Sequence, residues 1–200
     1  GKGAAIGAIA GGAGGAVIGD QNRRQSERDA QAAATPSSVA PPSPPPVPPA
    51  VATADQNRLA LTRFARSWSI AGWQTVDGQR RLVSGTATGT VENAFFVRLV
   101  VNVTDDQTGW ASKGDVWFAS EPGRGITMDS RFNTLPIPVT HAGTVSADGS
   151  LFTLDETTPG VANRLTVIRF LSDSEFVVDD TERINGRNIP IGSLSFSATR

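Results

Sequence analysis

The stretch Ala94-Phe-Phe-Val-Arg-Leu-Val-Val-Asn-Val-Thr104 carries the clearest structural signal in this sequence. Polar side chains such as Arg98 and Asn102 alternate with apolar ones at every second position, namely Phe95, Val97, Leu99, Val101 and Val103. Successive side chains of a β-strand point to opposite faces of its sheet. The alternation therefore predicts a strand with one face against a core and the other toward solvent.

The same alternation recurs in shorter runs along the second half of the chain, for example at 126–133, 174–184 and 193–197. Turn-forming pairs separate such runs: Asp77-Gly78, Asp148-Gly149 and Asn185-Gly186. Asp-Gly and Asn-Gly pairs between alternating runs are hairpin signals. About ten short strands without long helices between them predict an antiparallel sheet. Closure into an up-and-down barrel would remove its edges and enclose a core, with room for a cavity.

A short helix is predicted immediately before the strands, at 55–66. Leu59, Leu61 and Phe64 are its apolar residues, and Thr53 or Asp55 can cap its first turn. The predicted β-barrel domain, including this helix, covers residues 55–200.

A proline-rich segment at 35–54 precedes the predicted domain. Eight of the fourteen residues from Pro36 to Pro49 are proline. Such a composition favours polyproline II, which rises about 3.1 Å per residue and acts as a semi-rigid spacer. A Pro-x-x-Pro ligand for a recognition domain is the alternative interpretation.

Glycine recurs at every fourth position at the start of the chain, at Gly3, Gly7, Gly11, Gly15 and Gly19. In a helix these residues share one face, which lets another helix approach closely. The eight glycines of residues 1–19 would prevent a stable helix in water, because each costs about 0.8–1.0 kcal/mol relative to alanine. We therefore predict that residues 1–34 form a glycine-zipper helix with a polar extension, which packs against copies of itself in or at a membrane. The alternative is a flexible Gly/Ala leader.

Residues 1–20 resemble the glycine-zipper domain of bacterial envelope proteins, many of which are lipoproteins. The resemblance covers a tenth of the chain. It implies a bacterial cell envelope and the outer membrane, on its periplasmic or surface side. The sequence contains no cysteine, so the resemblance places any lipidated cysteine before Gly1.

A second resemblance concerns the barrel. The run Arg66-Ser-Trp-Ser-Ile-Ala-Gly-Trp73, which opens a hairpin-rich region, is similar to the start of lipocalin-like barrels. In those proteins a tryptophan of the first strand closes the barrel floor. The resemblance implies a lipocalin-like fold with a cavity for a small apolar ligand. The residues predicted to line that cavity are Trp68, Trp73, Phe95 and Phe132.

Composition and motifs argue against several classes of function. With 18 basic and 19 acidic residues, the chain has no excess of charge that would favour nucleic acid. The absence of cysteine excludes disulfides and thiolate catalysis. His141, the one histidine, has no recognisable nucleophile motif to serve, and a structural role is expected for it. Asp179, Asp180 and Glu182 form a small acidic cluster, in which a strand would place Asp180 and Glu182 on one face and Asp179 on the other, so they are not one paired-carboxylate site. They are interpreted as a solvated outer face, paired with Arg169 or Arg183. We expect no enzymatic activity, no cofactor and no metal.

Two functions remain open from the sequence. The first is a structural protein of the envelope that forms homo-oligomers through its glycine-zipper helix and displays the barrel on a proline-rich arm. The second is a membrane-anchored, lipocalin-like binder of a small apolar molecule.

Overall fold

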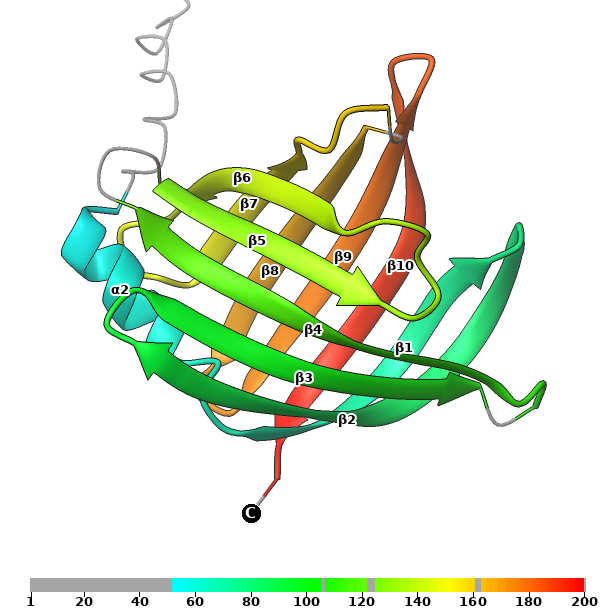
Figure 1. The fold of residues 1–200 in the computed structure, drawn as a ribbon, viewed down its shortest axis with the longest axis horizontal. Coiled ribbons are helices and arrows are strands. Elements are labelled where there is room, and N and C mark those ends of the chain that lie inside the picture. Colours follow the sequence, from blue (N-terminus) through cyan, green and yellow to red (C-terminus); the bar gives the residue numbers. More distant parts are fainter. Residues whose placement is uncertain (1–51, 106, 122–124, 161–162, 200) are drawn as a thin grey trace, which may run out of the picture. The chain divides into compact units, whose positions relative to one another are not determined.

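A short helix and ten strands make up the computed structural model, which describes residues 52–105, 107–121, 125–160 and 163–199 (Figure 1). The elements in chain order are α2 (Ala54–Thr62), β1 (Ser67–Val76), β2 (Gln79–Asn93), β3 (Phe96–Asp105), β4 (Trp110–Glu121), β5 (Gly125–Phe132), β6 (Val139–Val145), β7 (Leu151–Glu156), β8 (Arg164–Ser172), β9 (Glu175–Ile184) and β10 (Arg187–Ala198).

The ten strands form a closed antiparallel barrel. Each strand pairs with the next along the chain, and β1 also pairs with β10, where Trp68 lies opposite Ala198. Closure leaves no free sheet edge among these strands, so no row of backbone donors and acceptors is exposed to another chain. The prediction of a mainly β chain with an up-and-down barrel of about ten strands is confirmed.

Two hairpins end in the turns that the sequence indicated. In the β1–β2 turn, Asp77 and Gly78 have φ angles of 52° and 73°. In the β9–β10 turn, the φ angles of Asn185 and Gly186 are 51° and 76°. Two successive positive φ angles are typical of a type I′ turn, whose twist matches the twist of the flanking strands.

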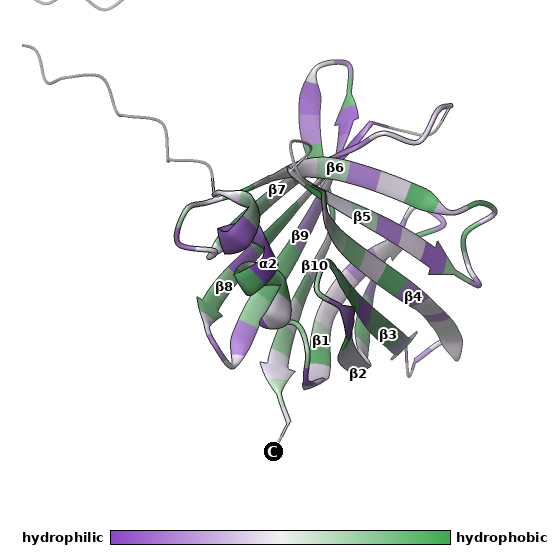
Figure 2. Ribbon diagram, turned by 60° about the vertical axis from the view of Figure 1, so that its left-hand side comes forward, coloured by the Kyte–Doolittle hydropathy of each residue, from purple (hydrophilic) through white to green (hydrophobic). Residues whose placement is uncertain are grey.

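Strand β3 has the alternation expected of it. Its inward side chains Val97, Leu99, Val101 and Val103 are buried, whereas Val100 on the outer face is 48% exposed. Figure 2 shows the same pattern around the barrel, where hydrophobic and hydrophilic bands alternate along the strands.

Phe95 was predicted on the inner face of this strand, and that prediction is wrong. The strand begins at Phe96, and Phe95 lies in the preceding turn, where its N–H donates to the side-chain oxygen of Asn93 at 2.9 Å. Phe95 is 46% exposed as a result.

Helix α2 closes one end of the barrel. It ends at Thr62, four residues before the predicted end, and it begins with a capping box between Thr53 and Gln56. The ring of Phe64, just after the helix, stacks on Phe118 at 4.6 Å between centroids. Trp68 Nε1 donates to the carbonyl of Phe64 at 3.0 Å. The end of the barrel beside α2 is therefore filled by packed aromatic rings, and we call it the closed end.

The predicted glycine-zipper helix at 1–34 and nearly all of the proline-rich linker at 35–54 lie outside the described residues. Their boundaries, like the start of the barrel domain at residue 55, stay predictions. In the part of the chain that is described, no helix combines the length and apolar character needed to span a membrane.

Candidate functional site

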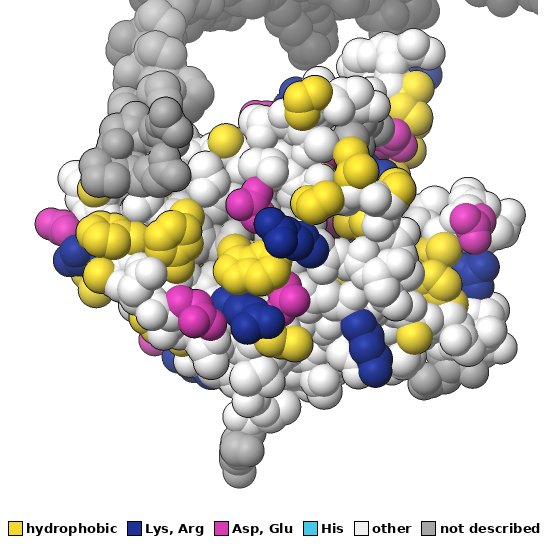
Figure 3. Space-filling model, viewed as in Figure 1, with side chains coloured by type: hydrophobic (Ala, Val, Ile, Leu, Met, Phe, Trp, Pro, Cys, Tyr) yellow, Lys and Arg dark blue, Asp and Glu magenta, His cyan; other side chains and the backbone are white. Residues whose placement is uncertain are grey.

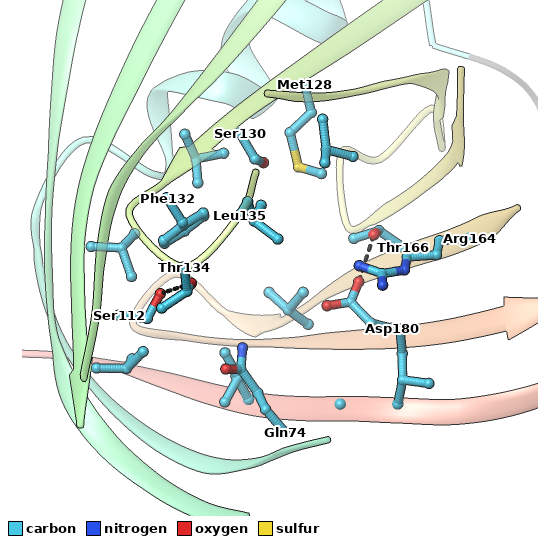
Figure 4. A pocket seen from close by; sticks show the side chains of 18 of the residues that line it. Gln74, Ser112, Met128, Ser130, Phe132, Thr134, Leu135, Arg164, Thr166 and Asp180 are labelled. Atoms are coloured by element: carbon cyan, nitrogen blue, oxygen red, sulfur yellow. Dashed lines mark hydrogen bonds between the residues drawn. The ribbon is translucent and has the colours of Figure 1, made fainter. Parts of the chain in front are cut away.

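A cavity of about 530 Å³ occupies the barrel interior between the aromatic rings of the closed end and the opposite mouth, which we call the open end. Apolar side chains supply most of its wall, including Leu99 and Val101 from β3, Met128 and Phe132 from β5, and Leu194 from β10. Leu135, in the loop between β5 and β6, also faces the cavity (Figure 4). Pockets of 300–1,000 Å³ with such walls are typical small-molecule sites.

The interior is hollow because the inward residues change size along the barrel. At the closed end they are large rings such as Phe118 and Phe176, and Phe64 reaches in from beyond the helix. Toward the open end the inward positions carry small side chains or none, for example Ser112, Ser130 and Gly192. The small residues leave a volume that the chain itself does not fill.

Polar side chains of β6, β8 and β9 meet on one side of this cavity. Thr166 Oγ1 donates to Asp180 Oδ1 at 2.5 Å, and His141 Nε2 lies 3.4 Å from the same Thr166 oxygen. Strand register places Thr166 directly opposite Asp180, while His141 lies on β6, two strands away from β8. Figure 4 shows Arg164 beside Thr166 and Asp180, with Phe132, Thr134 and Leu135 across the cavity. We call His141, Arg164, Thr166 and Asp180 the polar wall.

Burial changes the acid–base behaviour of the polar wall. Desolvation, with the positive charge of Arg164 as a second cause, lowers the pKa of His141 to about 4, so its imidazole is neutral near pH 7. Burial raises the pKa of Asp180, opposed by the hydrogen bond from Thr166 and by the charge of Arg164. Burial also raises the pKa of Glu156, which lies opposite His141 at the end of β7.

Several polar atoms here are buried and have no hydrogen-bond partner within the described residues. They are His141 Nδ1, Arg164 Nε and both carboxylate oxygens of Glu156. Buried polar atoms are usually paired, and an unpaired one costs about 1–3 kcal/mol. Two residues of the polar wall, His141 and Arg164, therefore each carry a buried polar atom without a hydrogen-bond partner in the described residues.

The open end is stabilised by a separate network. Asp105 Oδ2 accepts from Thr108 at 2.6 Å and lies 3.4 Å from Arg81 Nη1. These contacts fix the turn between β3 and β4, and they lower the pKa of Asp105, with the Thr108 hydrogen bond as the largest cause. This carboxylate is satisfied by its own turn, so we assign it a structural role.

Of the four residues predicted to line a cavity, only Phe132 does so. Trp68 is fully buried but belongs to the closed end, against Phe176 at 4.7 Å. Trp73 lies on the outer face of β1, with the guanidinium of Arg80 4.0 Å from its ring. Trp68 and Trp73 are five positions apart, so in one strand their side chains point to opposite faces. Phe95 lies in the turn described above.

The sequence analysis missed most of the polar wall. Asp180 was assigned to a solvated outer face, but it faces the cavity, while its neighbour Asp179 lies outside and pairs with Arg169 at 2.6 Å. His141 was expected to be a barrel-rim or strand histidine without a role; it lies on β6 and lines the cavity. In β8, Arg164, Thr166 and Ile168 occupy every second position and therefore share one face. The apolar Ile168 on that face was the signal that Thr166 also faces inward.

The outer surface presents no comparable site over β3–β5. A hydrophobic area there is bordered by basic and acidic side chains (Figure 3). The guanidinium groups of Arg98 and Arg131 lie 5.6 Å and 5.3 Å from the ring of Trp117, on β4. Arg98 in turn pairs with Asp115 at 2.7 Å. These groups satisfy one another.

In the described residues no three histidine or acidic side chains are grouped so as to hold a metal ion.

Comparison with solved structures places this architecture in a known class of fold. No protein-family model matches the chain, and no curated protein matches it. The chain is similar to the crystal structure of Rv2717c from M. tuberculosis, with 12% identity and a TM-score of 0.56 over 72% of this chain and 98% of that one. It is also similar to the S-type phycobiliprotein lyase CPES from Guillardia theta, with 16% identity and a TM-score of 0.50 over 72% of this chain and 95% of the lyase. The shared feature is a ten-stranded antiparallel barrel of the lipocalin-like class.

Proposed function

We propose that this protein binds a small, largely apolar molecule inside its barrel. The observation that carries the proposal is the cavity of about 530 Å³, with an apolar wall and a few polar groups on one side. A cavity of this size could instead have been filled by larger side chains, which would add stability through burial and packing. A bound ligand would fill the cavity and make the packing contacts that the protein's own side chains do not make. Of the two functions that the sequence left open, the cavity supports the binding function.

We propose a binding protein and not an enzyme because most of the cavity wall is apolar and the sequence has no recognisable nucleophile motif. The one imidazole in the wall is also a weak base near neutral pH, since the pKa of His141 is lowered to about 4 by burial and by Arg164.

The binding function is tested by filling the cavity in the full chain. Val101 faces the cavity and Val100 faces outward on the same strand, which gives a matched pair of substitutions. Val101→Trp should abolish fluorescence enhancement of the neutral apolar dye N-phenyl-1-naphthylamine, and Val100→Trp should retain it. Circular dichroism checks that both variants are folded. Equal dye binding by wild type and both variants would exclude the cavity as the binding site. Native mass spectrometry of the purified chain then identifies any co-purifying molecule.

We propose further that residues 1–34 assemble the chain in or at a bacterial outer membrane and that the proline-rich arm separates them from the barrel. The support is the four-residue spacing of the glycines from Gly3 to Gly19. Leucine in place of Gly7, Gly11 and Gly15 should reduce the oligomer to a monomer in detergent, as measured by analytical ultracentrifugation, without changing dye binding. An oligomer that survives these changes would refute this part of the proposal.

A further inference from the structure

We propose that the cavity recognises a neutral ligand whose polar group both donates and accepts hydrogen bonds, such as a carboxamide, bound between Arg164 and Asp180. This inference rests on the proposed binding function and names the class of ligand. It is carried by two side chains of opposite charge that line the cavity on neighbouring strands and do not pair with each other.

Arg164 on β8 and Asp180 on β9 both line the cavity, and their side chains extend into it from adjacent strands (Figure 4). Among the described residues, no ion pair or hydrogen bond joins these two side chains. Burial raises the pKa of Asp180, and the hydrogen bond from Thr166 and then the charge of Arg164 oppose that shift. The two charges therefore lie near enough to interact but leave a place for a group that contacts both.

Both side chains have accessible polar atoms without a partner in the described part of the chain. Asp180 Oδ1 accepts from Thr166, whereas Asp180 Oδ2 has no hydrogen-bond partner there. The two Nη atoms of Arg164 also have none, and unlike Arg164 Nε they are not buried. A guanidinium can only donate hydrogen bonds, and a carboxylate can only accept them. A group between the two must therefore accept from Arg164 and donate to Asp180.

The space beside Asp180 is open because its neighbour on β10 is a glycine. Strand register places Gln74, Gly192 and Asp180 in one row across β1, β10 and β9. A Cβ at Gly192 would lie 3.8 Å from Asp180 Cβ and 3.7 Å from Gln74 Cγ, so a group of methyl size fits between these side chains. Gln74 also lines the cavity, and its amide supplies a further donor and acceptor (Figure 4).

A charged head group gains less from this arrangement. Among the described residues that line the cavity, the only other carboxylate is that of Asp77, which is exposed in the β1–β2 turn. Burial, and then Arg164, lower the pKa of His141 to about 4, so this side chain is neutral. An ion of either sign would meet one opposite and one like charge while it loses its own hydration. A carboxamide loses less hydration and contacts both groups.

The test compares four ligands of the same shape: decanamide, decanoate, decanamidine and 2-undecanone. Each displaces N-phenyl-1-naphthylamine from the full chain at pH 8, chosen because burial raises the pKa of Asp180. We expect decanamide to bind more tightly than both ions. It should also bind more tightly than the ketone, which accepts but cannot donate and which a purely apolar cavity would prefer. Tighter binding of the ketone or of either ion would overturn the inference. Absence of dye binding by the wild type would instead reject the proposed binding function.

Two pairs of charges on the same two strands provide matched variants. Arg164 and Asp180 face the cavity, whereas Arg169 and Asp179 pair on the outer face at 2.6 Å. Arg164→Met leaves a lone carboxylate in the wall and should raise the affinity for decanamidine relative to decanoate by about tenfold. Asp180→Asn leaves a lone guanidinium and should shift this ratio the other way by a similar factor.

The outer variants Arg169→Met and Asp179→Asn should leave the ratio unchanged. If an inner variant does not bind the dye, Arg164→Gln or Asp180→Ser replaces it, and the wild-type ligand series remains decisive. Inner variants that shift the ratio in the same direction, or not at all, would contradict the assignment. Outer variants that shift it as strongly as the inner ones would contradict it as well.

Discussion

At the closed end of the barrel Phe64, Trp68 and Phe176 are almost completely buried against one another, whereas at the open end His141, Thr166 and Asp180 line an unfilled cavity. Both ends use inward positions of the same ten strands, and Phe64, which follows α2, adds its ring to the closed end. At the closed end, large rings pack together and stabilise the fold through buried apolar area. At the open end, small and polar side chains leave a cavity and buried polar groups without partners, which lower stability.

The comparison shows how one barrel separates a packed core from an open cavity. The same closed sheet forms the wall at both ends, with register shifts in three of its strand pairs. The division lies in the side chains, with Phe118 and Phe152 at one end and Ser112 and Ser130 at the other. Substitutions should therefore have different effects at the two ends.

The largest expected effect is that of Phe64→Ala. Phe64 is 0% exposed, and its ring contacts those of Phe118, Phe152, Phe170 and Phe176. Loss of a buried phenylalanine typically costs about 3–5 kcal/mol. We expect a decrease of that size in the free energy of unfolding, measured by urea denaturation. Phe132→Ala, at the half-buried cavity wall, is the control and should cost clearly less. Equal losses would mean that the two ends do not differ in packing.

A pair of glycines tests the difference in free space. A Cβ at Gly72 would lie 2.1 Å from the carbonyl oxygen of Ser193 in the paired strand. At Gly192, which lines the cavity, the nearest atom would be 3.5 Å away. We expect Gly72→Ala to cost about 3 kcal/mol, because β1 and β10 must separate locally. Gly192→Ala should change the free energy of unfolding by less than about 1 kcal/mol. A reversed order in thermal denaturation would contradict the geometry.

The pH dependence of stability tests the burial of His141. Its pKa is lowered from 6.5 to about 4 in the folded protein, by burial and then by Arg164, while the charges of Asp155 and Asp129 oppose the shift. Between these pH values the unfolded chain binds a proton that the folded chain does not, so stability falls as the pH decreases. The loss amounts to about 3 kcal/mol at most.

His141→Gln removes this dependence and provides the measurement. The raised pKa values of Asp180 and Glu156 act in the opposite direction, because these carboxyls are protonated more readily when folded, but they are present in both proteins. The wild type should therefore lose stability relative to His141→Gln when urea titrations move from pH 7 to pH 4. Parallel pH profiles would show that the imidazole is not buried in the neutral form.

The smallest expected effect is on the outer face. Arg169 Nη2 lies 2.6 Å from Asp179 Oδ2, with the two side chains 54% and 31% exposed. Surface ion pairs contribute about 0–1 kcal/mol. Arg169→Gln should therefore change the thermal midpoint little, and any change should disappear at high salt. A loss as large as that of Phe64→Ala would show that the outer charges hold the barrel together.

Local patterns in the sequence were sufficient for the strands and their turns. The alternation from Val97 to Val103 and the pairs Asp77-Gly78 and Asn185-Gly186 were both confirmed. The face of single aromatic residues was harder to predict. Trp73 was assigned to the cavity, although its separation of five positions from Trp68 places it on the outer face. Phe95 was assigned to the strand, but it lies in the turn before the strand begins.

The polar wall was outside the reach of such patterns. In a barrel with an internal ligand site, polar residues occupy inward positions, so hydrophilicity no longer indicates the outer face. Alternation within β9 places Asp179 and Asp180 on opposite faces. Because both are aspartates, the register of β9 with its neighbours decides which of the two faces the cavity.

The sequence by itself determined the class of fold, because strand alternation and hairpin turns depend on residues close together in the chain. It also carries the glycine spacing at 1–34, which lies outside the described residues and awaits its own test. The tertiary structure decided where the cavity lies and which polar groups face it. His141, Thr166 and Asp180 come from three strands and meet only through the register of the closed barrel. Such convergence depends on pairing between distant segments, which no local pattern records.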